Sequence, residues 1–461
     1  MRSTPELDAR TGLEKLATYP YQILTWVDDA GYPVSVAVDA RVDQVGLTAR
    51  FEAPGGLSVP TDREVSLTGS HIRPQPGYGY DERRHVTVWG PATISGHTVS
   101  VAGRTAWGWD EAEVPFFEYS ERSVGKSRAY FDALSAERGT PVKPRLSFGF
   151  LTLRATRLPF LTATIVPVTL GILIAASHGA FDPFAAVLTI IGASFVQLGL
   201  NVANDVFDTL SGADDANVTP TKFSGGSRVI QYGLVSLRQM ATLSTVFYTL
   251  AGLSGLILLA THPSIPLLAI GIVGFIVSLG YTAPPLKFVY RGLGEIAVAL
   301  GFGPLMLLGA YVVQTNGALS WEPFVASIPV ALLVALILYV NEIPDRRGDA
   351  HAGKRTLPVR FSPTAVITGY NVAVIAAYVV LVAGVVAGLL PIPVLLMLLT
   401  IPLALRVSRG LEPNYDNPYG LMAIMGINVQ LHLMAGLLLL GAYLIVLIVG
   451  AVAPTVHLFL R

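Results

Sequence analysis

Residues 197 to 232 begin Gln-Leu-Gly-Leu-Asn-Val-Ala-Asn-Asp-Val-Phe-Asp-Thr-Leu-Ser-Gly-Ala-Asp-Asp and, from Thr221, continue Thr-Lys-Phe-Ser-Gly-Gly-Ser-Arg-Val-Ile-Gln-Tyr. This stretch starts as the end of an apolar segment and becomes a cluster of carboxylates and amides. In a helix, Asn201, Asn204 (or Asp205) and Asp208 share one face, and Asp214 follows a Ser-Gly break. Hard oxygen ligands suit Mg²⁺, which takes few protein carboxylates and completes its shell with water and phosphates. Carboxylates at the end of a membrane segment are energetically unfavourable, so their presence indicates a function. The stretch therefore predicts a Mg²⁺–diphosphate site at a membrane surface.

A second acidic cluster has the same placement. Asn341, Asp345 and Asp349 are spaced by fours directly after an apolar run, so they also share a helical face. Taken singly, each cluster could be no more than a solvated helix end. Two such half-sites on two membrane helices favour the alternative, in which they face each other and hold metal ions between them.

The composition places much of the chain in lipid. Of 461 residues, 52% are hydrophobic and only 13% are charged, and the mean hydropathy is +0.57, whereas soluble proteins average about a quarter charged residues. The formal net charge is zero, which argues against a nucleic-acid partner. With no cysteine, disulfides, thiolate metal sites and a catalytic thiol are excluded.

Hydrophobicity and charge are segregated along the chain. Residues 1–145 are typical of a soluble domain, and 150–455 of a helical membrane bundle. Apolar segments long enough to span a bilayer, or nearly so, are expected at 158–177, 182–203, 238–260, 264–281, 295–314, 323–341, 364–389, 391–405 and 422–453, the last with room for a break. Lys and Arg occur only in alternate connections, apart from the terminal Arg461, so the positive-inside rule predicts that the soluble domain and every charged loop are cytoplasmic.

The N-terminal region alternates apolar and polar residues in short runs, which predicts an antiparallel β domain with strands at 21–27, 34–38, 46–51, 65–69, 85–89 and 98–102 and a helix at 114–137. Residues 28–31, Asp-Asp-Ala-Gly, are a predicted hairpin turn. The runs at 23–33, 65–69 and 86–92 resemble the split barrel of pyridoxamine-phosphate-oxidase-like proteins. The resemblance implies either a cofactor-free domain or one that binds FMN or a related flavin, and it allows a homodimer through this domain.

Basic residues near the acidic clusters are candidates for binding a diphosphate. Arg228 follows Ser-Gly-Gly-Ser, where small residues permit close backbone approach to an anion, and Lys287 follows the rigid run Tyr-Thr-Ala-Pro-Pro. Lys222, Lys354 and Arg355 are further candidates. The alternative for each is that it only follows the positive-inside rule.

Four motifs in order resemble the UbiA superfamily of intramembrane aromatic prenyltransferases, over about residues 150–455. They are Asn204–Asp214, the loop from Tyr281 to Lys287, the run from Tyr290 to Glu295, and Asn341–Asp349 followed by Gly-Lys-Arg-Thr-Leu at 353–357. The first motif places its last aspartate ten residues after Asn204 and has Gly212 at the eighth, which is similar to the MenA-like branch, the 1,4-dihydroxy-2-naphthoate prenyltransferases of menaquinone synthesis.

The resemblance implies a nine-helix bundle that transfers an isoprenyl group from a polyprenyl diphosphate to an aromatic acceptor. It implies Mg²⁺ ligands at Asn204, Asp208, Asp214, Asp345 and Asp349, with Asn201, Asp205 and Asn341 as second choices. Diphosphate contacts are implied at Lys222, Arg228 and Lys287. Tyr281 is a candidate for orienting the diphosphate or the acceptor, although an interfacial tyrosine is often only an anchor.

Other readings stay open at this point. A UbiA-type enzyme could use another quinone precursor or a lipid as acceptor, and the fused N-terminal domain departs from the usual stand-alone enzyme. A different membrane transferase of lipid head groups would be expected to carry its acids in another spacing on one helix. A membrane-tethered flavin reductase would make the β domain the enzyme. A secondary transporter is disfavoured because the acids lie at the ends of spans and no inverted repeat is evident.

Overall fold

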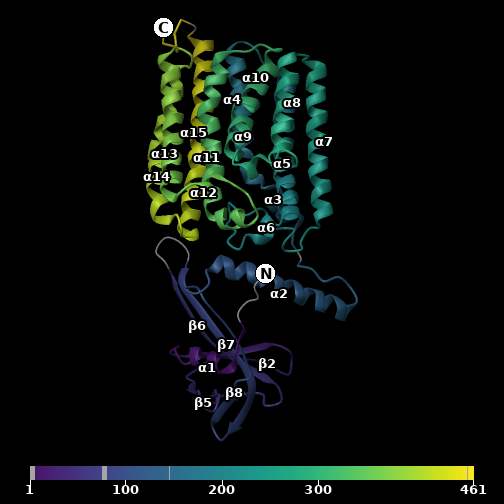
Figure 1. Cartoon of the computed structure of the whole chain (residues 1–461), viewed down its shortest axis with the longest axis vertical. Coiled ribbons are helices and arrows are strands. Elements are labelled where there is room, and N and C mark those ends of the chain that lie inside the picture. The colour runs from purple at the N-terminus through teal and green to yellow at the C-terminus, as the bar shows by residue number, and fades with distance from the viewer. Residues whose placement is uncertain (1–5, 75–79, 145, 454, 461) are drawn as a thin grey trace. The chain divides into compact units, whose positions relative to one another are not determined.

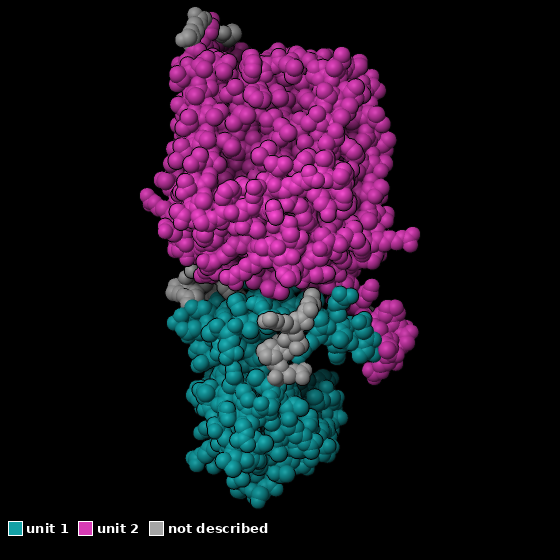
Figure 2. All heavy atoms as spheres, viewed as in Figure 1, with its two compact units in different colours: residues 1–133 teal, residues 134–461 magenta. Residues whose placement is uncertain are grey.

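The computed structural model describes residues 6–74, 80–144, 146–453 and 455–460. The chain divides into two compact units, Met1–Ala133 and Leu134–Arg461, which Figure 2 distinguishes by colour. The predicted order, a β domain followed by a helical membrane bundle, is confirmed.

The N-terminal unit is an antiparallel sheet with a small helix packed on it. Its elements are β1 (Glu6–Leu7), α1 (Ala9–Leu16), β2 (Gln22–Val27), β3 (Pro33–Val38), β4 (Arg41–Asp43), β5 (Thr48–Glu52), β6 (Glu64–Pro74), β7 (Tyr80–Ser95), β8 (Thr98–Ala102) and β9 (Thr105–Asp110), and α2 (Phe116–Arg138) follows. The strand order is β3-β2-β6-β7-β8-β5-β4, and β9 pairs with both β7 and β1. Alternate residues of the strands, among them Leu24, Leu67 and Val88, are fully buried, which is the pattern expected of a sheet with one face in the core.

The predicted hairpin turn is present between β2 and β3. The Asp28 carboxylate accepts hydrogen bonds from the backbone N–H groups of Ala30 and Tyr32, at 2.9 and 2.8 Å, and Gly31 supplies the positive φ of +87°. All six predicted strands and the helix exist, but β1, β4 and β9 were not predicted, and β7 is far longer than residues 85–89. The extension of β7 carries charged residues whose partners lie on neighbouring strands, as in the Arg73–Asp81 ion pair at 2.9 Å. Split-barrel topology and flavin binding stay predictions.

The second unit is a bundle of long apolar helices (Figure 1). In chain order it contains α3 (Phe148–Thr156), η1 (Leu158–Leu161), α4 (Thr162–Ser177), α5 (Pro183–Ser211), α6 (Ala213–Ala216), α7 (Leu237–Thr261), α8 (Ile265–Gly280), η2 (Phe288–Arg291), α9 (Gly294–Leu300), η3 (Gly301–Leu305), α10 (Met306–Gln314), α11 (Trp321–His351), α12 (Leu357–Arg360), α13 (Pro363–Val386), η4 (Ile392–Thr400), α14 (Ile401–Asn414) and α15 (Pro418–Val452). Within the described residues, eight helical segments are long and apolar enough to cross a membrane, and α8, with 16 residues, is a shorter apolar helix at the fourth predicted span, 264–281.

Two helices continue beyond the predicted membrane spans, and both extensions carry acidic residues. The second predicted span, 182–203, is α5, which remains helical to Ser211 and ends at Gly212 with φ +76°. The sixth, 323–341, is α11, which remains helical to His351. Both acidic clusters therefore lie on helices, as predicted. The last span is one continuous helix, α15, without a break.

The core of the bundle is centred on α11. Its membrane window is 72% buried, more than that of any other candidate span among the described residues, because α11 packs against α9, α13 and α15. A helix that is apolar all round is expected to be buried on all sides. This burial holds the acidic end of α11 firmly inside the bundle.

Candidate active site

The ends of α5 and α11 and the short helix α6 enclose a small polar cavity of about 100 Å³. Its lining gathers side chains from segments far apart in the sequence. They are Arg157, Asn204, Asp208, Ala213, Asp214, Asn217, Phe223, Ser224, Gly225, Gly226, Tyr281, Val289, Leu338, Asn341, Glu342, Asp345, Asp349 and Lys354. All five predicted primary metal ligands are among them, so the two half-sites face each other as the sequence predicted.

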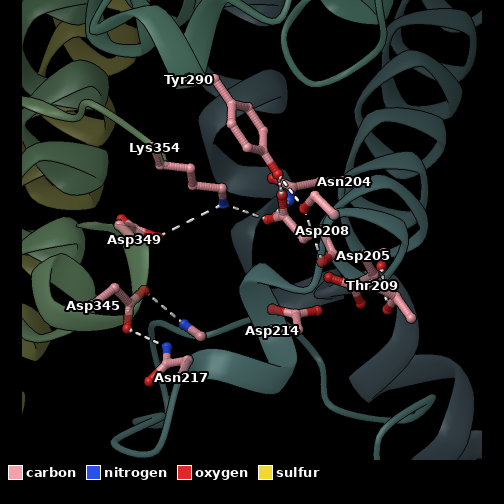
Figure 3. A network of polar contacts seen from close by, with 12 residues as sticks. Asn204, Asp205, Asp208, Thr209, Asp214, Asn217, Tyr290, Asp345, Asp349 and Lys354 are labelled. Atoms are coloured by element: carbon pink, nitrogen blue, oxygen red, sulfur yellow. Dashed lines mark hydrogen bonds and ion pairs between the residues drawn. The ribbon is translucent and has the colours of Figure 1, made fainter. Parts of the chain in front are cut away.

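Asp208 is the most connected carboxylate of the cavity (Figure 3). Lys354 Nζ lies 2.7 Å from Asp208 Oδ2 and 3.8 Å from Asp349 Oδ1, so one ammonium group links the two clusters. The Tyr290 hydroxyl donates to Asp208 Oδ1 at 2.9 Å, and the Asn204 amide donates to Oδ2 at 2.5 Å. Burial alone would lower the pKa of Lys354, but the carboxylates of Asp208 and Asp349 hold it above its usual value. Lys354 is therefore a permanent cation of the site.

Asp345 is held by the loop that follows α6. The Asn217 amide donates to Asp345 Oδ1 at 2.9 Å, and the backbone N–H of Gly225 donates to Oδ2 at 2.8 Å (Figure 3). Gly225 and Gly226 have φ values of +78° and +76°, which L side chains rarely adopt. The Gly-Gly pair thus shapes the loop so that its backbone reaches the second acidic cluster.

Asp214 has an oxygen without a partner. Its side chain is buried, and among the described residues no donor reaches Oδ2. A Cβ at Gly226 would lie 3.0 to 3.1 Å from the two carboxylate oxygens, so only glycine fits beside them without a shift. Burial, followed by the charges of Asp208 and Asp205, raises the pKa of Asp214 well above its usual value. A nearby cation would reverse this effect.

The charge of the cavity points to a divalent cation. Five carboxylates line it (Asp208, Asp214, Glu342, Asp345 and Asp349) against two cations (Arg157 and Lys354), an excess of three negative charges when all are ionised. Among the described residues, no three His, Asp or Glu side chains are close enough to surround a single ion by themselves. Mg²⁺ needs only one or two carboxylates together with water and phosphate oxygens. The oxygen-only donors and the unpartnered Asp214 oxygen therefore fit Mg²⁺ bound together with a phosphate-bearing ligand.

Two of the second-choice ligands are engaged elsewhere. Asp205 pairs with Arg157, with Nη2 and Oδ1 2.5 Å apart, and also accepts hydrogen bonds from Ser227. The Asn201 amide donates to the carbonyl of Thr156 at 3.0 Å. Neither lines the cavity, whereas Asn341 does.

The three basic residues predicted for the diphosphate do not line the cavity in this conformation. Arg228 is buried and donates to the backbone carbonyl of Asp214, so it supports the acidic loop. Lys287 Nζ lies 5.1 Å from the ring centroid of Tyr290, and the exposed Lys222 lies over Phe223. Their direct contact with a diphosphate stays a prediction.

Several residues of the site were not chosen from the sequence as site residues. Among them, Arg157, Asn217 and Glu342 line the cavity, and Tyr290 contributes through its hydrogen bond to Asp208. Glu342 and Tyr290 lie inside motifs that resemble the family, so the sequence contained the information needed to predict them as site residues. Arg157 and Asn217 carry no such signal, because their roles depend on how the loops fold back.

A second, apolar chamber of about 560 Å³ adjoins the polar cavity. It lies among α5, α7, α8, α9, η3 and α10, and Tyr281 lines both spaces. One face of α5 runs through both. Thr189, Gly192, Val196 and Leu200 line the chamber, and Asn204 and Asp208 line the polar cavity, at successive spacings of three and four residues. The arrangement suits a ligand with an anionic head and a long apolar tail.

Fold and site together define an integral membrane protein with a carboxylate-lined head-group cavity opening onto an apolar chamber. The chain belongs to the UbiA prenyltransferase family, whose profile matches residues 164–418. The family resemblance predicted from the sequence is thus confirmed.

Two named relatives and one solved structure illustrate the similarity. The chain is 28% identical over 300 residues to the 2-carboxy-1,4-naphthoquinone phytyltransferase of Synechocystis sp., covering 64% of this chain and 92% of the relative. It is 26% identical over 301 residues to the 1,4-dihydroxy-2-naphthoate octaprenyltransferase of Bacillus subtilis, covering 65% and 94%. A UbiA homolog from Archaeoglobus fulgidus, solved bound to GPP and Mg²⁺, aligns at 16% identity with a TM-score of 0.45, covering 63% of this chain and 99% of that one.

Proposed function

We propose that residues 150–455 form a Mg²⁺-dependent prenyltransferase that moves an isoprenyl group from a polyprenyl diphosphate to 1,4-dihydroxy-2-naphthoate. The observation that carries the proposal is the junction of two spaces. A carboxylate-lined cavity of about 100 Å³ meets an apolar chamber of about 560 Å³ at Tyr281. A polyprenyl diphosphate has the same division between its head and its tail.

The diphosphate head binds in the polar cavity. Asn204, Asp208 and Asp214 on one side and Asp345 and Asp349 on the other would hold Mg²⁺, which when bound neutralises charge on the leaving diphosphate. Lys354, already between the two clusters, adds a fixed positive charge. Without cations, the excess of carboxylates would repel the diphosphate.

The apolar chamber binds the tail and limits water. When the bond between the allylic carbon and the diphosphate oxygen breaks, its electron pair leaves with the diphosphate. The allylic cation is attacked by the electron-rich ring carbon of the acceptor, and a C–C bond forms there as the ring carboxylate departs as CO₂. The chamber is lined mainly by aliphatic side chains and glycines, so it keeps water from quenching the cation.

The naphthoate acceptor is supported by two features of the sequence. Both named relatives carry naphthoate or naphthoquinone prenyltransferase names, and the chain covers more than nine tenths of each. The first motif has its last aspartate at Asp214 and not at position 212. Another quinone precursor remains the second candidate.

Direct turnover tests the proposal. Purified full-length protein is incubated with Mg²⁺, a long-chain prenyl diphosphate and a panel of aromatic acids, and the products are identified by mass. We expect prenylated product from 1,4-dihydroxy-2-naphthoate, and its loss when the metal is chelated with EDTA. Product that forms equally well in EDTA would contradict the metal role, and absence of any prenylated acid would contradict the function.

The apolar chamber predicts control of tail length. Gly274 of α8 lines the chamber and has open space where a Cβ would stand. Gly274→Leu is expected to raise KM roughly tenfold for a long-chain diphosphate, because the new side chain occupies tail volume, and to change KM for geranyl diphosphate little. Gly441→Leu is the matched control, since Gly441 of α15 is equally unobstructed and lines neither space. Equal effects of both variants on both substrates would contradict the assignment.

The positive-inside rule places the polar cavity on the cytoplasmic side in this proposal. Because the chain has no cysteine, single cysteines report sidedness directly. In intact cells, a membrane-impermeant maleimide should label Ala318→Cys, in the exposed α10–α11 connection, and should label the exposed Arg409→Cys only after permeabilisation. The opposite pattern would invert the topology.

The N-terminal domain, residues 1–145 in the sequence-based division, keeps two untested predictions, FMN binding and a homodimer. The membrane-tethered flavin reductase is the matching alternative. Flavin absorbance in the purified full-length protein decides between a flavin-bearing and a cofactor-free domain.

A further inference from the structure

Two buried glutamates at the cavity have carboxyl oxygens that receive no hydrogen bond from the described residues. Glu342 of α11 is 5% exposed and Glu295 of α9 is 8% exposed. Among the described residues, no group donates a hydrogen bond to either oxygen of Glu342 or to Oε1 of Glu295. The two carboxyl groups are near neighbours. Buried carboxyl groups left without donors are strongly unfavourable, so a ligand that supplies donors is the natural explanation.

The glutamate pair lies where the polar and apolar spaces meet. Glu342 lines the polar cavity, one turn before Asp345. Glu295 shares a helical face with Val298 and Phe302, which line the apolar chamber. Tyr281 lines both spaces and so marks the boundary between them. A molecule that attacks the allylic carbon must reach this boundary.

The two substrates differ in whether they can donate a hydrogen bond to the glutamates. An ionised diphosphate presents only acceptor oxygens, and a prenyl tail presents no polar group, so neither satisfies a carboxylate. A dihydroxy-aromatic acceptor presents O–H donors on a flat apolar ring. Its ring fits the aliphatic boundary while its hydroxyl groups donate to the pair.

We propose that Glu295 and Glu342 form the hydroxyl-binding subsite for the aromatic acceptor, placed between the diphosphate cavity and the prenyl chamber. This inference rests on the proposed function and specifies its acceptor as a molecule recognised through ring hydroxyl groups. The two glutamates bind and orient the ring, and Tyr281 stands beside them.

Isosteric variants of the full-length protein test the subsite. We expect Glu342→Gln and Glu295→Gln each to raise KM for 1,4-dihydroxy-2-naphthoate roughly tenfold or more, because one acceptor oxygen is replaced by an amide nitrogen that cannot accept a hydrogen bond. KM for the prenyl diphosphate and the Mg²⁺ concentration for half-maximal activity should stay unchanged. Glu412→Gln, at an exposed residue of α14, is the control and should behave as the unaltered protein. Thermal unfolding in detergent should stay at the same temperature or rise, because a buried carboxyl group without donors is replaced by an isosteric amide.

Acceptors with methylated hydroxyl groups test whether the rise in KM comes from lost hydrogen bonds to those hydroxyl groups. Blocking the relevant hydroxyl as a methyl ether should weaken binding to the unaltered protein and add little further loss in Glu342→Gln, since the same hydrogen bond is then already absent.

Each remaining outcome has one meaning. Transfer by the unaltered protein with unchanged acceptor KM in both variants would overturn the subsite and leave the proposed function intact. A raised Mg²⁺ requirement without an acceptor effect would overturn it in favour of a metal role. Lower melting temperature with equal rises in both KM values would overturn it in favour of a structural role. No transfer by the unaltered protein to any aromatic acid would instead overturn the proposed function.

Discussion

Asp208→Asn is expected to lower kcat for prenyl transfer about 10²- to 10³-fold, the usual effect of removing one charge-stabilising group from an active site. Asp208 is 5% exposed and stands opposite the α11 cluster across the polar cavity. Its two carboxylate oxygens accept hydrogen bonds from Tyr290, Asn204 and Lys354. The substitution therefore removes the negative charge that these three side chains contact. The single-turnover rate at saturating Mg²⁺ and prenyl diphosphate measures the loss in the chemical step.

Asp345→Asn should cause a loss of similar size from the opposite half-site, because Asp345 lines the same cavity. Asp215→Asn is the control for both. Asp215 directly follows Asp214 but is exposed and lines neither space, so its substitution should leave kcat unchanged. Transfer at the normal rate by Asp208→Asn or Asp345→Asn, in protein with a normal melting temperature, would show that the two clusters do not form the catalytic site.

The helical periodicity of the sequence was enough to predict most of the helical fold and the acidic part of the site. Spacings of three and four residues place Asn204 and Asp208 on one face of α5 and Asp345 and Asp349 on one face of α11. The lengths of the apolar segments predicted the membrane spans. A segment in lipid must form its backbone hydrogen bonds internally, so a long apolar segment is expected to be a helix. The predicted spans end at 203 and 341, where hydropathy falls and the acidic residues begin, whereas the helices continue to Ser211 and His351.

The periodicity of the sequence could not predict which way individual side chains turn or how the loops fold. Asp205 follows Asn204 directly, yet a turn of about 100° per residue directs it to Arg157 and Ser227 and not into the cavity. Arg228 was predicted to meet the diphosphate, whereas its positive φ and the two preceding glycines bring it to the carbonyl of Asp214. Lys354 was only one of several basic candidates. Its position between Asp208 and Asp349 depends on how the chain leaves α11.

Lys354→Met is expected to reduce both stability and activity. The Lys354 and Asp208 side chains are 10% and 7% exposed, and their charged atoms lie 2.7 Å apart. Removing one partner of a buried pair costs about 3 kcal/mol or more because the other charge is left buried and uncompensated. We expect the melting temperature of the purified protein in detergent to fall by roughly 5 °C.

A second substitution separates charge compensation from simple loss of packing. If Lys354 stabilises the bundle by neutralising Asp208, then Asp208→Asn in the Lys354→Met background should raise the melting temperature again, because the uncompensated carboxylate is gone. If Lys354 mattered only for its methylene groups, the second change would bring no recovery, and Lys354→Met alone would be nearly neutral. Lys354→Arg is the conservative comparison and should retain most of the stability, since it keeps the charge. Recovered stability without recovered transfer in the double variant would show that the fold needs the two charges to balance, whereas the chemistry needs both of them present.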